Sequence, residues 1–227
     1  MQTKFNCTHC EKCCCETATQ IKLTVLDLIR LSKALGKPVS SLFFGYLGFK
    51  PFLEDGSVYS FEPGLNIPCV FYDDSKQKDK CNVYNSRPLN CRMFPFWILV
   101  QFSKKGISDN ETPCLSDLKL DKDEVEKYEK YSEKLGRIID EEENVTQEIM
   151  KRLNAVKKVD LSSNISGQWM DEKEFVRAKI NVLLSMIKRE DYTEIVKLLD
   201  KEITPELVEK AMVNLDKMNE LDNIVEE

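Results

Sequence analysis

The sequence predicts an α+β protein: a small cysteine-rich, metal-organised domain with short helices and short strands, followed by an all-α helical domain. The first domain is expected to span residues 1–115 and the second residues 116–227, because all nine cysteines and most of the glycines and prolines precede residue 116. Helical periodicity of apolar residues dominates beyond that point. With 42% hydrophobic and 32% charged residues, the 227-residue chain has the composition of a globular protein.

Five cysteines crowd the segment 7–15, which reads Cys-Thr-His-Cys-Glu-Lys-Cys-Cys-Cys. Thiolates are soft ligands that hold zinc ions and iron–sulfur clusters, and a two-residue gap lets a turning backbone direct two sulfurs at one point. No apolar leader precedes this segment, so we expect a cytoplasmic protein with reduced cysteines. An odd number of cysteines, three of them consecutive, also fits a disulfide framework poorly. The segment therefore predicts metal binding.

Capping and turn signals predict the elements that follow. A helix is expected to begin after Thr24, because Thr24 and Asp27 have the spacing of a capping box, and to end at Gly36. A second short helix is expected from Ser40. An Asp-Gly dipeptide at 55–56 lies between apolar stretches and predicts a hairpin turn.

Short elements are also predicted around the later cysteines. Residues 69–72 and 81–84 each begin with a cysteine and read as two more short strands, whose pairing would bring these two cysteines together. Pro88 suits the start of a short helix that carries Cys91 and that a further proline ends. Residues 96–102 read as another strand.

Three amphipathic stripes predict a helical bundle in the second half of the chain. The stripes consist of Val125, Tyr128, Leu135 and Ile138; of Phe175, Ala178, Val182 and Met186; and of Leu207, Ala211, Leu215 and Met218. The spacing of Glu126 and Lys130, and of Glu206 and Lys210, predicts two surface ion pairs on these helices.

Adjacent cysteines do not easily share one tetrahedral metal, because neighbouring side chains point to opposite faces of a strand and lie about 100° apart on a helix. They suggest two sites, or one site with a spare thiol. The candidate ligands are Cys7, Cys10, Cys13 and Cys14, together with Cys69, Cys81, Cys91 and Cys114. Eight thiols fill two four-cysteine sites, or one cluster site with reserve thiols. The ferredoxin-like spacing at 7–13 favours an iron–sulfur cluster of the 4Fe–4S type over zinc, the other candidate cofactor.

Four motifs occur together in the first half: C-x-x-C-x-x-C-C at 7–14, Ile-x-Leu-Thr-x-x-Asp at 21–27, Pro-Cys-Val-Phe at 68–71 and Cys-Asn-Val-Tyr-x-x-Arg-Pro-x-x-Cys-Arg-x-Phe-Pro at 81–95. Their combination resembles the YkgJ-like cysteine-cluster family, described as zinc- or iron-chelating domains. The resemblance covers residues 5–115 and implies the same eight cysteines as ligands, with Cys15 outside the set. Glu11 departs from the family pattern, which commonly has glycine after the second cysteine.

The resemblance also implies an activity, because flagellin lysine N-methylases with a similar cysteine motif are iron–sulfur enzymes; methyl transfer or redox chemistry is then expected. The alternatives are a structural zinc module whose helical domain binds a protein partner, and a metal storage or delivery protein. The net charge of −6 argues against nucleic-acid binding. No apolar run is long enough to span a membrane, and no glycine-rich phosphate loop is present.

Two arginines and a histidine lie close to the cysteines in sequence. Arg87 and Arg92 flank Cys91, where a fixed positive charge can stabilise a thiolate-ligated centre or bind an anionic group. Surface pairing with the aspartates at 73, 74 and 79 is the other interpretation. His9, the only histidine, is expected to be a partly exposed loop residue.

Overall fold

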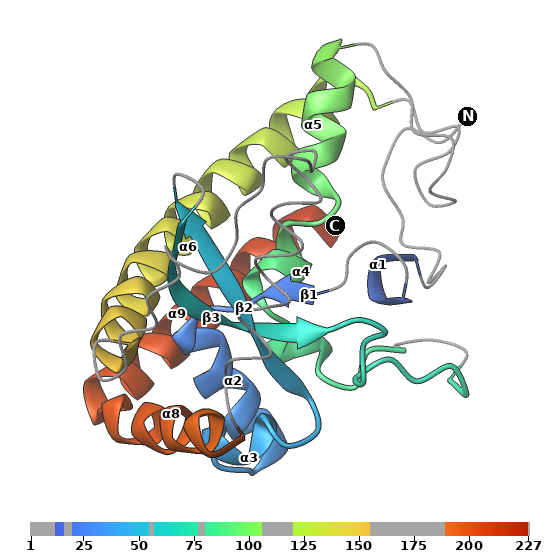
Figure 1. The fold of residues 1–227 in the computed structure, drawn as a ribbon. Helices are drawn as coiled ribbons and strands as arrows, with labels where there is room; N and C mark the ends of the chain where they lie inside the picture. Colours follow the sequence, from blue (N-terminus) through green and yellow to red (C-terminus); the bar gives the residue numbers. More distant parts are fainter. Residues whose placement is uncertain are drawn as a thin grey trace, which may run out of the picture.

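The computed structural model describes residues 12–15, 20–54, 57–76, 80–105, 120–154 and 189–226. Helices pack around one three-stranded antiparallel sheet, so the predicted α+β class is confirmed (Figure 1). In chain order the elements are α1 (Lys12–Cys15), β1 (Gln20–Lys22), α2 (Val25–Leu35), α3 (Val39–Leu42), β2 (Leu47–Glu54), β3 (Ser57–Asn66), the 3-10 helix η1 (Tyr84–Ser86), α4 (Leu89–Met93), α5 (Phe96–Lys105), α6 (Lys122–Asn154), α8 (Arg189–Glu202) and α9 (Pro205–Glu226). None of the helices in these ranges is long and apolar enough to cross a bilayer.

The sheet has the strand order β1-β3-β2, and both pairs are antiparallel. β2 and β3 form the predicted hairpin around residues 55–56. Gln20, the first residue of β1, lies opposite Asn66, the last residue of β3. The segment that precedes β1 and the segment that follows β3 therefore leave the sheet at the same end. This arrangement directs Cys15 and Cys69 toward each other, although 54 positions separate them.

Helix α2 begins and ends where its sequence predicts. The Thr24 hydroxyl accepts a hydrogen bond from the Asp27 backbone N–H at 2.9 Å, and the Asp27 carboxylate accepts one from the Thr24 N–H at 3.0 Å. Gly36 has a φ of 61° and closes the helix in the left-handed conformation that glycine adopts readily. Residues 25–31 are all buried, so α2 lies at the centre of the molecule rather than on its surface.

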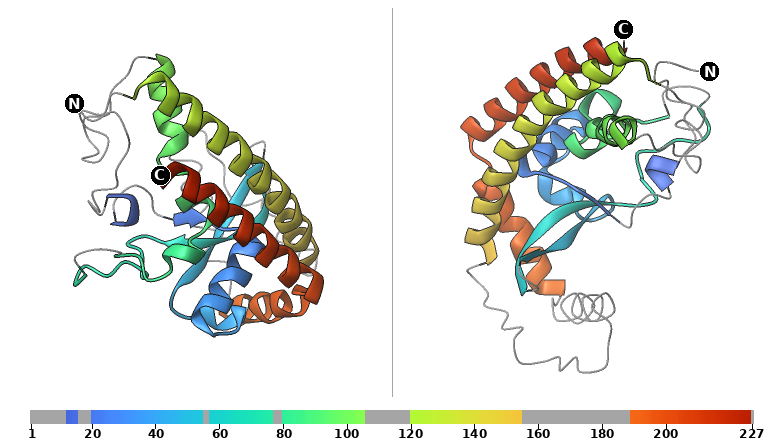
Figure 2. Two further views of the ribbon diagram at one scale, coloured as in Figure 1. Left: turned by 180° about the vertical axis from the view of Figure 1, so that it is seen from behind. Right: turned by 90° about the horizontal axis from the view of Figure 1, so that it is seen from above.

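The two longest helices, α6 and α9, lie side by side and run antiparallel (Figure 2). Lys210 near the start of α9 pairs with Glu141 at 2.6 Å, whereas Asp222 near the end of α9 accepts a hydrogen bond from Tyr131 at 2.7 Å. The predicted ion pair between Glu126 and Lys130 is confirmed, with a separation of 2.6 Å. The predicted ion pair between Glu206 and Lys210 is wrong, because Lys210 pairs instead with Glu141 of α6.

Two hydrophobic cores hold the fold together. The first lies between α2, α3, the sheet, the second half of α6, α8 and the start of α9, and includes Leu26, Phe49, Ile149 and Val196. The second lies between α4, α5, the first half of α6 and the end of α9, and includes Leu89, Phe96, Tyr128 and Met218. Both cores draw on residues from either side of position 115. That boundary itself lies outside the described residues, so the division into two domains stays a prediction.

Two predictions of strands are wrong. Between 69–72 and 81–84 the structure has a single antiparallel bridge, from Tyr72 to Cys81, followed by η1. Residues 96–102 lie in helix α5. Phe96, Leu99 and Val100 are buried there, at the spacing of one helical face, whereas Trp97 is 43% exposed. A short apolar run does not separate a helix from a strand, and here packing against α6 decides the outcome.

The other predicted elements of the first half are confirmed. The second short helix begins one residue before Ser40, and Pro88 precedes the helix that carries Cys91. The second predicted stripe, from Phe175 to Met186, lies outside the described residues. The first and third stripes lie on α6 and α9, where Tyr128, Leu135, Ala211 and Met218 are fully buried.

Candidate metal centre

The backbone brings α1 next to the loop that follows β3. The Cys69 N–H donates a hydrogen bond to the Cys14 carbonyl oxygen at 2.7 Å. Cys14 and Cys15 are both partly exposed, as is Cys69. This contact places the motif at 7–14 beside the motif at 68–71, although the two are far apart in the sequence.

The loop that carries Cys69 closes back on the segment of Cys81. The bridge between Tyr72 and Cys81 is accompanied by hydrogen bonds from the Asn82 N–H to the Phe71 carbonyl at 2.9 Å and from the Asp73 N–H to the Lys80 carbonyl at 2.8 Å. The predicted approach of Cys69 and Cys81 is therefore correct, although the predicted strands are not. Burial raises the pKa of the Cys69 thiol, and the neighbouring Cys81 and Cys15 raise it further.

Helix α4 adds Cys91 to the same neighbourhood. Its backbone N–H donates to the Pro88 carbonyl at 2.9 Å in the first turn of the helix. Burial raises the pKa of the Cys91 thiol well above its usual value, and Cys69, Cys81 and Cys14 add to the effect. Asp27 of α2 also contributes, because a buried carboxylate disfavours a second negative charge beside it.

The cysteines of three segments thus disfavour each other's ionised form: Cys14 and Cys15 of α1, Cys69 and Cys81 of the loop after β3, and Cys91 of α4. Among the described residues, Cys69, Cys81 and Cys91 form no disulfide. A thiophilic cation removes this cost, because it binds the thiolate form and neutralises the shared negative charge. The donor set therefore fits a zinc ion or an iron–sulfur cluster.

The described side chains do not by themselves form a finished site. Within the part of the chain that the structure describes, no three histidine, cysteine or acidic side chains converge tightly enough to hold a metal ion. Cys13 lies in α1, but its side chain is not among those described, and Cys7, Cys10, Cys114 and His9 lie outside the described residues. The eight-cysteine ligand set, with Cys15 excluded, stays a prediction. The proximity of Cys15 to Cys69 makes Cys15 the obvious residue to test.

No described ion pair joins Arg87 or Arg92 to Asp73 or Asp74, and Asp79, the third aspartate that the sequence suggests, lies outside the described residues. Both bind Asp222 of α9, Arg87 at 3.1 Å and Arg92 at a shorter distance. The described partners of Asp73 and Asp74 include Lys76 and Lys80. Burial raises the pKa of Cys81, whereas the positive charge of Arg87 acts in the opposite direction. Arg87 therefore lies close enough to favour a thiolate at Cys81, as expected for a residue near a thiolate-ligated centre.

A second buried network supports the site from the α2 side. The guanidinium of Arg30 binds both oxygens of Glu142 and one oxygen of Asp27, each at 2.7 Å. Asp27 also accepts a hydrogen bond from the Leu89 N–H at 3.1 Å. Since Leu89 begins the helix of Cys91, α2 fixes the start of α4. The capping box identifies Asp27 in the sequence, and its spacing of three residues from Arg30 permits their ion pair, but no local signal identifies the contact of Asp27 with α4 or that of Arg30 with Glu142.

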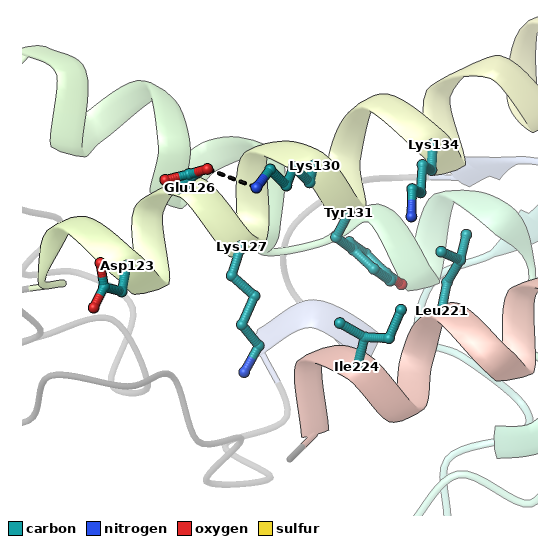
Figure 3. Close-up of a pocket in the computed structure, with 8 residues that line it drawn as sticks. All are labelled: Asp123, Glu126, Lys127, Lys130, Tyr131, Lys134, Leu221 and Ile224. Carbon is teal, nitrogen blue, oxygen red and sulfur yellow. Dashed lines mark hydrogen bonds and ion pairs between the residues drawn. The ribbon is translucent and has the colours of Figure 1, made fainter.

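A groove of about 380 Å³ lies between α6 and α9 (Figure 3). Its lining includes Lys127, Lys130, Lys134 and Tyr131 of α6 and Leu221 and Ile224 of α9. Glu126 pairs with Lys130, and Lys127 lies 3.4 Å from Glu124, so acidic neighbours offset much of the positive charge. The residues of the described ranges that line the groove include no cysteine.

Comparisons with known proteins agree with the cysteine chemistry. A family model named CxxCxxCC, with the description "Putative zinc- or iron-chelating domain", matches residues 6–131. The uncharacterized protein MJ0661 of Methanocaldococcus jannaschii is 30% identical over 153 residues, which are 63% of this chain and 76% of that protein. No solved structure matches the chain. The model match spans more than half of the sequence and includes every cysteine from Cys7 to Cys114. The chain therefore belongs to the CxxCxxCC family of zinc- or iron-chelating domains.

Proposed function

We propose that the protein holds a thiolate-ligated metal centre and that its occupant is an iron–sulfur cluster. The ligands are drawn from Cys7, Cys10, Cys13 and Cys14 and from Cys69, Cys81, Cys91 and Cys114. One observation carries the proposal: the hydrogen bond from the Cys69 N–H to the Cys14 carbonyl and the bridge between Tyr72 and Cys81 bring the cysteine segments together, near enough for their thiols to raise one another's pKa. Thiolates held this close repel one another, and a bound metal cation removes that cost.

The number of thiols supports a cluster rather than one zinc ion. A structural zinc ion takes four ligands in a tetrahedron. The predicted set has eight cysteines, of which Cys14, Cys69, Cys81 and Cys91 lie in the described neighbourhood, so the whole set exceeds what one zinc ion takes. A cluster with reserve thiols, or two metal sites, uses such a set more fully. A structural zinc module remains the second candidate, because zinc binds the same ligand type and competes strongly for it.

A bound iron–sulfur cluster supplies one-electron chemistry. The chain's own residues supply the setting: Cys91 is only partly exposed, and the positive charge of Arg87 favours thiolate at Cys81. If the protein is an enzyme, methyl transfer of the kind found in flagellin lysine N-methylases, or redox chemistry, is the expected class. The α6–α9 pair offers a surface for a protein substrate or partner.

Single serine substitutions test the ligand set. Cys69→Ser, Cys81→Ser and Cys91→Ser should each lower the iron and sulfide content of anaerobically purified protein, because serine is a poor ligand for soft metals. Cys15→Ser is the matched control, since Cys15 lies in the same neighbourhood but outside the predicted set. Full metal content in all three variants would refute the ligand assignment. A loss in Cys15→Ser as large as that in Cys69→Ser would show that Cys15 belongs to the set.

A further inference from the structure

The end of α9 makes a buried ionic contact with the segments that carry two of the cysteines. Asp222 accepts hydrogen bonds from Arg87 at 3.1 Å, from the Tyr131 hydroxyl at 2.7 Å and from Arg92. The side chain of Arg92 is fully buried, and that of Asp222 is 10% exposed. One carboxylate from α9 is therefore shared between two guanidinium groups, those of Arg87 and Arg92.

Arg92 connects this carboxylate to both cysteine segments. Its guanidinium donates to the Asn85 carbonyl at 2.6 Å and to the Arg87 carbonyl at 3.2 Å. Asn85 lies in η1, which follows Cys81 closely, whereas Arg92 itself lies on α4 next to Cys91. A single side chain thus fixes the distance between the backbone of the Cys81 segment and that of the Cys91 helix.

Further contacts hold Asp222 in place. Asn219, one turn earlier on α9, accepts a hydrogen bond from Arg92 at 3.1 Å. Tyr131 points from α6 toward α9, beside Leu221 and Ile224 (Figure 3). The Tyr131 hydroxyl lies 3.3 Å from the Arg92 carbonyl oxygen as well. The carboxylate, the tyrosine and the arginine therefore form one connected network between α4, α6 and α9.

We propose that Asp222 is a positioning residue of the metal centre, which orients Arg92 and Arg87 so that Cys81 and Cys91 are held at the separation that the centre needs. This inference rests on the proposed function. Without the Asp222 charge, two buried guanidinium groups lose a shared anionic partner, and the η1 and α4 segments lose a common anchor. Because coupling is reciprocal, metal binding in turn stabilises the docking of α9 on α4.

The test compares Asp222→Asn with Asp216→Asn in the full chain. Both substitutions remove one negative charge from α9, but Asp216 is exposed. Asp222→Asn should weaken Zn²⁺ binding by about 10–100-fold, as expected when a residue that supports a metal ligand is changed, and should shift the thiolate-to-Co²⁺ absorption bands of the Co²⁺-loaded protein. Asp216→Asn should change neither. Asp222→Glu, which keeps the charge, should restore part of the affinity.

A metal-free readout separates this inference from the proposed function. In the apo protein, Asp222→Asn should raise the alkylation rates of Cys81 and Cys91, measured by mass spectrometry, relative to Asp216→Asn. Equal alkylation rates and equal Zn²⁺ affinities in the two variants would overturn the positioning role. Two results together would overturn the proposed function but keep Asp222 as an anchor of the two cysteines: the wild-type chain takes up no metal, and Asp222→Asn still raises the alkylation rates above those of Asp216→Asn. If Asp222→Asn does not fold, Tyr131→Phe removes one hydrogen bond and should give a smaller change in the same direction; no change would refute the inference.

Discussion

Replacement of Arg30 by methionine is predicted to cost about 3–5 kcal/mol of unfolding free energy, because it breaks a buried ionic network by removing one partner. The side chains of Arg30, Asp27 and Glu142 are all 0% exposed. Burial lowers the pKa of Arg30, but the two carboxylates more than offset this effect and raise it. Methionine preserves much of the volume of arginine but leaves both carboxylates without their cation. The loss is a large fraction of the total stability of a typical domain, about 5–15 kcal/mol.

Urea unfolding followed by far-UV circular dichroism measures this loss, with Arg152→Met as the matched control. Arg152 also pairs with a glutamate at 2.7 Å, but its side chain is 56% exposed. An exposed pair contributes about 1 kcal/mol or less, so the control should unfold at nearly the wild-type urea concentration. Equal losses of unfolding free energy in the two variants, or a loss below about 1 kcal/mol in Arg30→Met, would refute the reasoning that burial makes this network important for stability.

Two further predictions concern pH and a helix end. The unfolding free energy of the metal-free protein should fall as the pH rises above about 8.5, because the folded thiols of Cys69, Cys81 and Cys91 have raised pKa values and keep protons that the unfolded chain releases. With bound Zn²⁺, which keeps its ligands ionised, stability should instead rise with pH up to about 8.5 and then level off. A pH-independent apo stability in urea titrations would contradict the assignment. Gly36→Ala should cost about 1 kcal/mol in thermal unfolding, because φ at Gly36 is 61°. Gly45→Ala, where the space is equally open and no positive φ occurs, is the control and should be within about 0.5 kcal/mol of wild type.

The elements predicted correctly depend on interactions within a few residues. The capping box of Thr24 and Asp27 and the left-handed position of Gly36 are written into consecutive side chains, so the limits of α2 follow from the sequence. The hairpin around 55–56 follows for the same reason. The α5 region is predicted wrongly because the apolar run 96–100 fits either period, and only its contacts with α6 select the helix.

The candidate site was predictable in its chemistry but not in its supports. The residue type and spacing of the cysteines predict metal binding, and the family motif implies that they lie close together. The partners of Arg87 and Arg92 could not be found in this way, because Asp222 lies 135 and 130 residues further along the chain. Nothing in the local sequence of α9 distinguishes that aspartate from its exposed neighbour Asp216.

The central claim is that this cysteine neighbourhood holds a metal centre. The most direct measurement is the iron, zinc and acid-labile sulfide content, with an absorption spectrum, of the full chain purified without oxygen. We predict a brown protein with stoichiometric iron and sulfide. Zinc without sulfide would contradict the iron–sulfur assignment in favour of a zinc site. A protein with neither iron nor zinc above trace would contradict the metal centre itself.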